Sequence, residues 1–231
     1  MIGEKKAVQA KEGKLLPVLK KFVSKNTAEF SNIKGNLLST TPKADMKVIM
    51  VTSSTQGEGK TISSLSLAYT LANLSKDKVL LVDGSLKSPL IHKLFGLEPD
   101  PGLSDIIADN INYSSAIKST DVDNLYIMPF GSKSANTVIN TNYKNLEGIF
   151  GTLRNEYDYI IYDGRSILDS SDTTIIAKHF DGILMVIECE KVKWEVVQTA
   201  KTKLESAGGT IFSSILNKRK YYIPKFLYGL M

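Results

Sequence analysis

Residues 48–61 read VIMVTSSTQGEGKT, an apolar run followed at once by a loop of small, hydroxyl-bearing and glycine residues. The apolar run is typical of a buried strand, and residues 61–74 continue with the spacing of a helix. A strand, a glycine-rich turn and a helix in this order form a cradle for phosphate groups. The sequence therefore predicts a phosphate-binding loop between residues 53 and 61.

The side chains of this loop match the chemistry that a nucleoside triphosphate requires. Gly57 and Gly59 let backbone N–H groups approach phosphate oxygens, Lys60 reaches the β- and γ-phosphates, and the Thr61 hydroxyl binds Mg²⁺. Ser54 stands where the usual pattern, G-x-x-x-x-G-K-[ST], has its first glycine, so an ordinary turn with a chance Gly-Lys-Thr is the alternative. The expected nucleotide contacts are Ser54, Thr55, Gln56, Gly57, Glu58, Gly59, Lys60, Thr61 and Ile62.

The rest of the chain alternates strand-like and helix-like segments. Strands are expected at residues 47–52, 79–83, 125–129, 159–163, 182–187 and 210–216, and helices at 61–74, 89–94, 103–108, 143–156, 172–178 and 194–207. Such alternation predicts an α/β fold of three layers, in which helices cover both faces of a mainly parallel sheet.

Composition places the chain among ordinary globular proteins. It has 231 residues, of which 42% are hydrophobic and 23% charged, enough to bury a sizeable core. Cys189 is the single cysteine, which excludes an internal disulfide and fits a reducing compartment. No apolar run reaches the length of a membrane span, and no signal-peptide pattern is present, so the sequence predicts a cytoplasmic protein.

Positive charge gathers at the two ends. Residues 1–47 carry ten Lys and four acids, a net charge of +6, and residues 218–231 carry four cations and no acid. The whole chain is +5, so the segment between them is −5. This distribution predicts attraction to an anionic membrane surface or an acidic partner, with plain solvated ends as the alternative. No base-reading motif accompanies it, so nucleic acid is not an expected partner.

The chain divides into four segments. Residues 1–13 are polar and are expected to be disordered. Residues 14–44 are expected to form a helical arm and a linker, because apolar residues recur there at helical spacing. Residues 45–217 form the domain that contains the phosphate loop, and residues 218–231 form a basic, aromatic tail.

Two acids end predicted strands at the edge where parallel sheets bind ligands. Asp163 follows the apolar run YIIY, and a carboxylate there binds Mg²⁺ or merely caps the next turn. Asp83 follows VLLV, and we expect it to orient or deprotonate a hydroxyl that attacks the γ-phosphate. Lys87 adds positive charge where negative charge develops. A solvated turn is the alternative for Asp83 and Lys87.

Six strings of the sequence, taken together, resemble the bacterial P-loop tyrosine autokinases. They are KVIMVTSSTQGEGKT, KVLLVDGSLKSP, GLSDIIADN, NLYIMPFG, YDYIIYDG and SSILN, and the resemblance covers about residues 28–217. It implies a P-loop NTPase fold, ATP and Mg²⁺ as cofactors, and a role in capsule or exopolysaccharide synthesis. It also implies self-association and a partner, the cytoplasmic segment of a membrane polysaccharide co-polymerase, which would hold the chain at the inner face of the membrane.

The resemblance assigns roles to individual residues. It implies that Thr61, Asp83 and Asp163 bind the metal and that Asn217, after the last strand, contacts adenine. Asp83, Lys60 and Lys87 are the catalytic candidates.

Three departures from the family pattern put kinase activity in doubt. The motif D-x-D-x-R has Ser85 and Lys87 at its second Asp and its Arg, and the turn after Asp163 lacks its prolines. The self-association motif E-x-x-R-x-x-R-T-N survives only as residues 28–36, without its Glu and both Arg. A misplaced or missing base costs roughly 10²–10⁴ in rate.

The tail contains Tyr221, Tyr222 and Tyr228 among basic and apolar residues. In the family, tyrosines at the C-terminus accept the phosphoryl group, so these three are the candidate acceptors. A basic aromatic segment also fits a membrane interface or a partner groove, and simple packing is the third interpretation.

Two other functions stay open beside a tyrosine kinase. The first is a nucleotide-gated regulator that binds ATP and docks on a membrane partner without phosphorylating it. The second is a partition ATPase of the MinD/ParA type. That family carries a signature Lys in the loop where this chain has Thr55, which favours the kinase branch.

Overall fold

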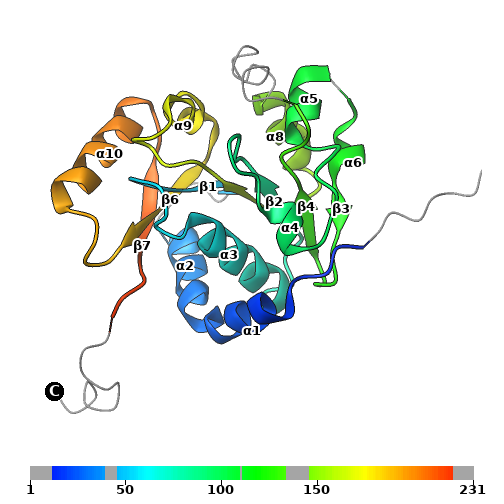
Figure 1. Ribbon diagram of the computed structural model, residues 1–231, viewed down its shortest axis with the longest axis horizontal. Helices are drawn as coiled ribbons and strands as arrows, with labels where there is room; N and C mark the ends of the chain where they lie inside the picture. The colour runs from blue at the N-terminus through cyan, green and yellow to red at the C-terminus, as the bar shows by residue number, and fades with distance from the viewer. Residues whose placement is uncertain (1–11, 40–45, 110, 134–145, 221–231) are drawn as a thin grey trace, which may run out of the picture.

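The computed structural model describes residues 12–39, 46–109, 111–133 and 146–220. A seven-stranded sheet with the order β3-β4-β2-β5-β1-β6-β7 crosses the molecule, with helices on both faces (Figure 1). Neighbouring strands are parallel except for β3 and β4. The strands are β1 (Val48–Ser53), β2 (Val79–Asp83), β3 (Lys118–Ser119), β4 (Leu125–Met128), β5 (Tyr159–Asp163), β6 (Gly182–Glu188) and β7 (Ile211–Asn217). The predicted three-layer α/β fold is confirmed.

The helices divide between the two faces of the sheet, α1 to α4 on one and α5, α8, α9 and α10 on the other (Figure 1). Side chains of β1 alternate accordingly, with Ile49 and Val51 packed in the first core and Val48 and Met50 in the second. The helices are α1 (Pro17–Lys25), α2 (Thr27–Ser39), α3 (Lys60–Leu74), α4 (Ile91–Leu94), α5 (Leu103–Asp109), α6 (Tyr113–Ala116), α8 (Leu146–Leu153), α9 (Ser171–Ile176), the 3₁₀ turn η1 (Ala177–His179) and α10 (Trp194–Ser206).

Every predicted strand is present within one residue of its expected ends. The helices predicted at 61–74, 103–108 and 194–207 are also found within one residue, whereas the one at 89–94 begins only at Ile91. The helix at 172–178 is split into α9 and η1, and α8 is shorter than the predicted 143–156, part of which lies outside the described residues. The sequence did not predict β3 and α6, which are too short for a periodic pattern.

Hydrogen bonds fix the beginning of the N-terminal arm, up to α1, to the rest of the fold. Gly13, expected in the disordered segment, donates its N–H to Ser119 O at 3.0 Å. Asp121 accepts from Leu15 N at 2.9 Å and from Lys20 Nζ at 3.0 Å. Residues 1–11 and the linker at 40–45 lie outside the described residues.

The apolar side chains of the arm are not all buried. Val23 of α1 and Phe30 and Ile33 of α2 are buried, whereas Leu16 and Phe22 are 44% and 48% exposed. Among the helices of the described ranges, none has both the length and the apolar character that crossing a bilayer requires.

Candidate nucleotide site

The loop between β1 and α3 turns sharply at its two glycines. Gly57 and Gly59 have φ angles of 87° and 102°, in the left-handed region that side chains rarely adopt. A Cβ atom at Gly59 would also overlap the side-chain amide of Asn217, at the end of β7. Gly59 caps α3, and the first N–H groups of a helix have no partner within it. The loop therefore has the shape that a phosphate site requires.

Lys60 begins α3, and its side chain folds back along the loop. Its Nζ donates to Ser53 Oγ at 3.0 Å. Burial lowers the pKa of Lys60, while the nearby carboxylates of Asp163 and Glu58 act in the opposite direction. A partly buried ammonium group thus stands beside the loop, where it can neutralise phosphate charge.

Asp163 ends β5 and is 2% exposed. Its Oδ1 accepts a hydrogen bond from Ser64 Oγ at 3.0 Å, and the hydroxyl of Thr61 donates to it as well. Burial raises the pKa of Asp163 to about 7 and Asp83 adds to the rise, while Thr61, Ser64 and Lys60 oppose it. The carboxylate and the two hydroxyls from one face of α3 are oxygen ligands of the kind that Mg²⁺ prefers.

Asp83 lies directly opposite Asp163 in the parallel pairing of β2 with β5. Its carboxylate is fully buried and accepts three backbone N–H groups: Ser85 N at 3.0 Å on Oδ1, and Leu90 N at 2.9 Å and Ile91 N at 3.0 Å on Oδ2. Burial raises its pKa, and these three bonds oppose the rise. Since a carboxylate has about four acceptor positions, Asp83 holds the turn before α4 with most of its capacity.

The turn that Asp83 holds contains the two residues that depart from the family motif. Ser85 is half-buried, and Lys87 is exposed. The catalytic role of Lys87 stays a prediction.

Glu58 supports the loop from inside and does not point its carboxylate outward. The side chain is fully buried. Its Oε1 accepts from Thr55 N at 2.5 Å and Thr55 Oγ1 at 3.0 Å, and its Oε2 accepts from Glu188 N at 3.1 Å. Of Glu58, only the backbone is therefore placed to contact a nucleotide.

The beginning of the tail is hydrogen-bonded to the same loop. Asn217 Nδ2 donates to Glu58 O at 2.8 Å, and Asn217 Oδ1 accepts from Lys218 N at 2.9 Å. Lys218, with a φ of 56°, donates from Nζ to Gly57 O at 2.6 Å and to Glu188 Oε2 at 3.1 Å. Asn217 thus lies at the loop and supports its backbone. Its contact with adenine stays a prediction.

The segment after β5 lies along the other side of the loop. Ile167 N donates to Ser53 O at 2.9 Å, and Leu168 N donates to Ser54 O at 3.1 Å. This segment takes the place of the proline turn of the family, and it holds the start of the loop by backbone bonds.

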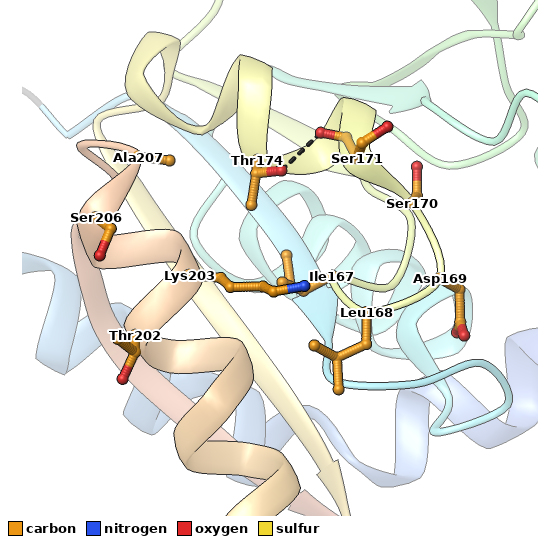
Figure 2. Close-up of a pocket in the computed structure, with 10 residues that line it drawn as sticks. All are labelled: Ile167, Leu168, Asp169, Ser170, Ser171, Thr174, Thr202, Lys203, Ser206 and Ala207. Atoms are coloured by element: carbon orange, nitrogen blue, oxygen red, sulfur yellow. Dashed lines mark hydrogen bonds between the residues drawn. The ribbon is translucent and has the colours of Figure 1, made fainter.

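A cavity of about 620 Å³ lies between this segment and α10. Figure 2 shows Lys203 extending from α10 toward Leu168 and Ile167, with Ser171 and Thr174 along the rim. Because Leu168 contributes both to the cavity and to the support of the loop, a molecule bound there would touch the loop's support. The lining residues are Ile167, Leu168, Asp169, Ser170, Ser171, Thr174, Thr202, Lys203, Ser206 and Ala207.

Two observations test whether the site fits a nucleotide with Mg²⁺. Ser54 Oγ is fully buried and has no hydrogen-bond partner among the described residues, which is unusual for a buried hydroxyl and fits an absent polar ligand. No group of three or more His, Cys, Asp or Glu side chains that could hold a metal ion is found in the described ranges. If Mg²⁺ is held by Thr61 and Asp163, water and phosphate oxygens would supply its other ligands, as is common for Mg²⁺.

Comparison with known proteins agrees with this geometry. A family model described as an AAA domain matches residues 46–209. The tyrosine-protein kinase CpsD of Streptococcus pneumoniae is 32% identical over 186 residues, which cover 80% of this chain and 82% of that protein. The chain belongs to the bacterial tyrosine-protein kinase family.

Solved structures place this member of the family among kinase domains and related ATPases. The kinase domain of VpsO superposes with a TM-score of 0.76 and 28% identity over 89% of this chain and all of that one. The septum site-determining protein MinD of Pyrococcus horikoshii, complexed with Mg-ADP, gives a TM-score of 0.65 and 25% identity over 78% of this chain and 75% of that chain.

The structure brings Lys60, Thr61, Asp83 and Asp163 to one edge of the sheet, as predicted from the strand ends. Sequence reasoning missed Ser64, although it lies one helical turn after Thr61 on the same face of α3. It also missed Glu188 and Lys218 as supports of the loop, because such distant partners leave no local pattern. Tyr221, Tyr222 and Tyr228 lie outside the described residues.

Proposed function

We propose that this chain is an ATP- and Mg²⁺-dependent protein-tyrosine autokinase that serves exopolysaccharide or capsule synthesis. The observation that supports this proposal best is the grouping of Lys60, Thr61, Asp163 and Asp83 at one sheet edge. Its proposed setting is the inner face of the membrane, beside the cytoplasmic segment of a polysaccharide co-polymerase. That setting rests on the family resemblance and on the basic ends of the chain.

In the proposed reaction, Lys60 and the loop N–H groups hold the triphosphate, and Thr61 and Asp163 hold Mg²⁺. Bound there, Mg²⁺ would supply positive charge that offsets the negative charge of the phosphates. A tyrosyl oxygen of the tail attacks the γ-phosphorus, the bond from that phosphorus to the bridging oxygen breaks, and ADP leaves. The tyrosyl proton passes to the Asp83 carboxylate, whose raised pKa suits a proton acceptor.

Purified protein with labelled ATP and Mg²⁺ tests this proposal. We expect label on the tail and its loss when Tyr221, Tyr222 and Tyr228 are all changed to Phe. Lys60→Ala is the negative control, because it removes the cation that holds the phosphates. Unlabelled wild-type protein that still binds ATP tightly, even with the co-polymerase segment added, would contradict the proposal.

The nucleotide-gated regulator is the second candidate, and the environment of Asp83 favours it. Three backbone N–H groups already occupy this carboxylate, and Ser85 replaces the second acid of the motif. If Ser85 limits the chemistry, Ser85→Asp should raise the rate of phosphorylation within the roughly 10²–10⁴ range of a general base. An unchanged rate would remove that explanation.

The partition ATPase is supported least. Thr55, at the position of the signature Lys of that family, donates to Glu58 Oε1 at 3.0 Å and so belongs to the internal support of the loop. A partition ATPase would hydrolyse ATP faster with DNA or lipid and would do so without residues 218–231. Hydrolysis stimulated in that way, with no labelled tyrosine, would favour this third function.

A further inference from the structure

Helix α1 presents apolar side chains to solvent next to lysines. Val18 is 73% exposed, Phe22 is 48% exposed, and Leu16 just before the helix is 44% exposed. Val18, Lys21, Phe22 and Lys25 follow one another at i, i+3, i+4 and i+7, so they share one face of the helix. Apolar residues scattered singly are normal on a surface, whereas a stripe of them calls for an explanation.

The orientation of this face is set by the rest of the arm. Val23 on the inner face is fully buried, and Leu19 packs against the same core. Lys20, on the flank, is paired with Asp121 at 3.0 Å. Because these contacts hold the inner side, α1 cannot bury Val18 and Phe22 by rolling over without losing them.

Positive charge predominates around the exposed stripe. Residues 13–28 contain Lys14, Lys20, Lys21 and Lys25 and no acid. Beside α1 lies a hollow of about 670 Å³ that is lined by Lys14, Lys20 and Lys21 together with Leu16 and Tyr69. Asp121, the acid that lines it, is already paired with Lys20. The hollow is therefore suited to an anionic group next to an apolar surface.

Basic residues also follow the end of β7, although Lys218 among them is paired with Glu188 Oε2 at 3.1 Å. Helix α2 packs against β7. In Figure 1 the chain leaves β7 toward the side on which α1 and α2 lie, and residues 218–220 of this segment are exposed and basic.

We propose that the exposed face of α1 docks on an anionic lipid bilayer. Phe22 and Val18 would enter the headgroup boundary, while Lys21 and Lys25 extend along their stems to the phosphates. A lipid surface is favoured over an acidic peptide because this face of α1 combines exposed apolar side chains, Val18 and Phe22, with the basic side chains of Lys21 and Lys25. A bilayer offers negatively charged headgroups above an apolar interior, so binding does not require individual acidic residues at matching positions. This inference does not rest on the kinase proposal.

Sedimentation of the full chain with vesicles, without nucleotide, tests the proposal. We expect binding to vesicles of equal parts phosphatidylcholine and phosphatidylglycerol, and little binding to phosphatidylcholine alone. The double variant Lys21→Ala/Lys25→Ala should weaken binding by about 25-fold, because each lysine near an anionic surface contributes about fivefold. Val18→Ser/Phe22→Ser should weaken it by at least about tenfold through the lost apolar contact.

Matched variants on the opposite face of the sheet serve as controls. Lys193→Ala/Lys201→Ala removes two positive charges, as the double lysine variant of α1 does, but at the start of α10 and within it. Ile175→Ser removes an exposed apolar side chain of α9. Both control proteins should bind the mixed vesicles as the wild type does. All the changed side chains are at least partly exposed, so circular dichroism should show unaltered folding.

A fluorescence experiment reports insertion directly. In a Trp194→Phe background, Phe22→Trp places the only tryptophan on the proposed face, and its emission should shift to the blue when mixed vesicles are added. The proposal would be overturned by equal binding to both vesicle types or by an equal loss of binding in the control variants. It would also be overturned if the emission shifted only with a second copy of the chain or an acidic peptide and not with vesicles.

Discussion

At the residue scale, Asp163 couples the stability of the fold to pH. Its pKa is raised from 3.8 to about 7, chiefly by burial and then by Asp83. The folded chain therefore binds a proton at Asp163 that the unfolded chain releases over this range, so the free energy of unfolding falls as pH rises from about 4 to about 7. Asp163→Asn should remove this dependence, which denaturant unfolding at several pH values would measure.

Lys60 supplies the control for this titration. Its positive charge lowers the pKa of Asp163, so in Lys60→Met this pKa should rise further, and the loss of stability with rising pH should continue to higher pH than in the wild type. The pH at which Asp163 of the folded protein is half-deprotonated should therefore be higher in Lys60→Met than in the wild type. If the free energy of unfolding of Asp163→Asn still falls with rising pH, other groups cause the fall. Asp83 is the first candidate, since burial raises its pKa as well.

At the scale of elements, the end of β7 and the phosphate loop form one unit. Asn217 Nδ2 is the donor to Glu58 O at 2.8 Å. Asn217→Ala should lower the free energy of unfolding by about 1 kcal/mol and weaken nucleotide binding several-fold, because the loop loses a support and pays more ordering entropy on binding. Calorimetric titration with ATP analogues would measure the affinity. Asn155→Ala, an exposed amide after α8, is the matched control and should leave affinity unchanged.

Strands and helices were predictable from sequence where the apolar pattern is long. The strands predicted in this way include those that carry the acids of the site. The runs VIMV, VLLV and YIIY are continuous because both faces of each strand are buried, and the acids that end β2 and β5 therefore meet at one edge. Asp83 was predicted at this edge, yet its three backbone bonds arise from a turn whose path no spacing reveals. The spacing of apolar residues in α1 likewise does not say whether Phe22 is covered, since helical periodicity identifies an apolar face but not what packs against it.

At the scale of the whole molecule, the site joins parts of the chain that are distant in sequence. Residues from β1, α3, β2, β5, β6 and β7 reach the loop or its acids. A ligand that bridges them stabilises the folded chain as a unit, because it binds the native state and not the unfolded one. The gain should be visible in global unfolding and not only near the loop.

Thermal unfolding with nucleotide therefore tests the site as a whole. At a hundred times its dissociation constant, a ligand adds about 2.7 kcal/mol, which corresponds to a rise in Tm of roughly 5–10 °C for a chain of this size. We expect this rise with ATP and Mg²⁺, and a much smaller one when a chelator removes the metal. Lys60→Ala should abolish it, whereas Ser85→Asp should retain it because the loop supplies most phosphate contacts. If Lys60→Ala were stabilised as strongly as the wild type, the nucleotide would bind elsewhere, and the cavity beside α10 would be the next place to look.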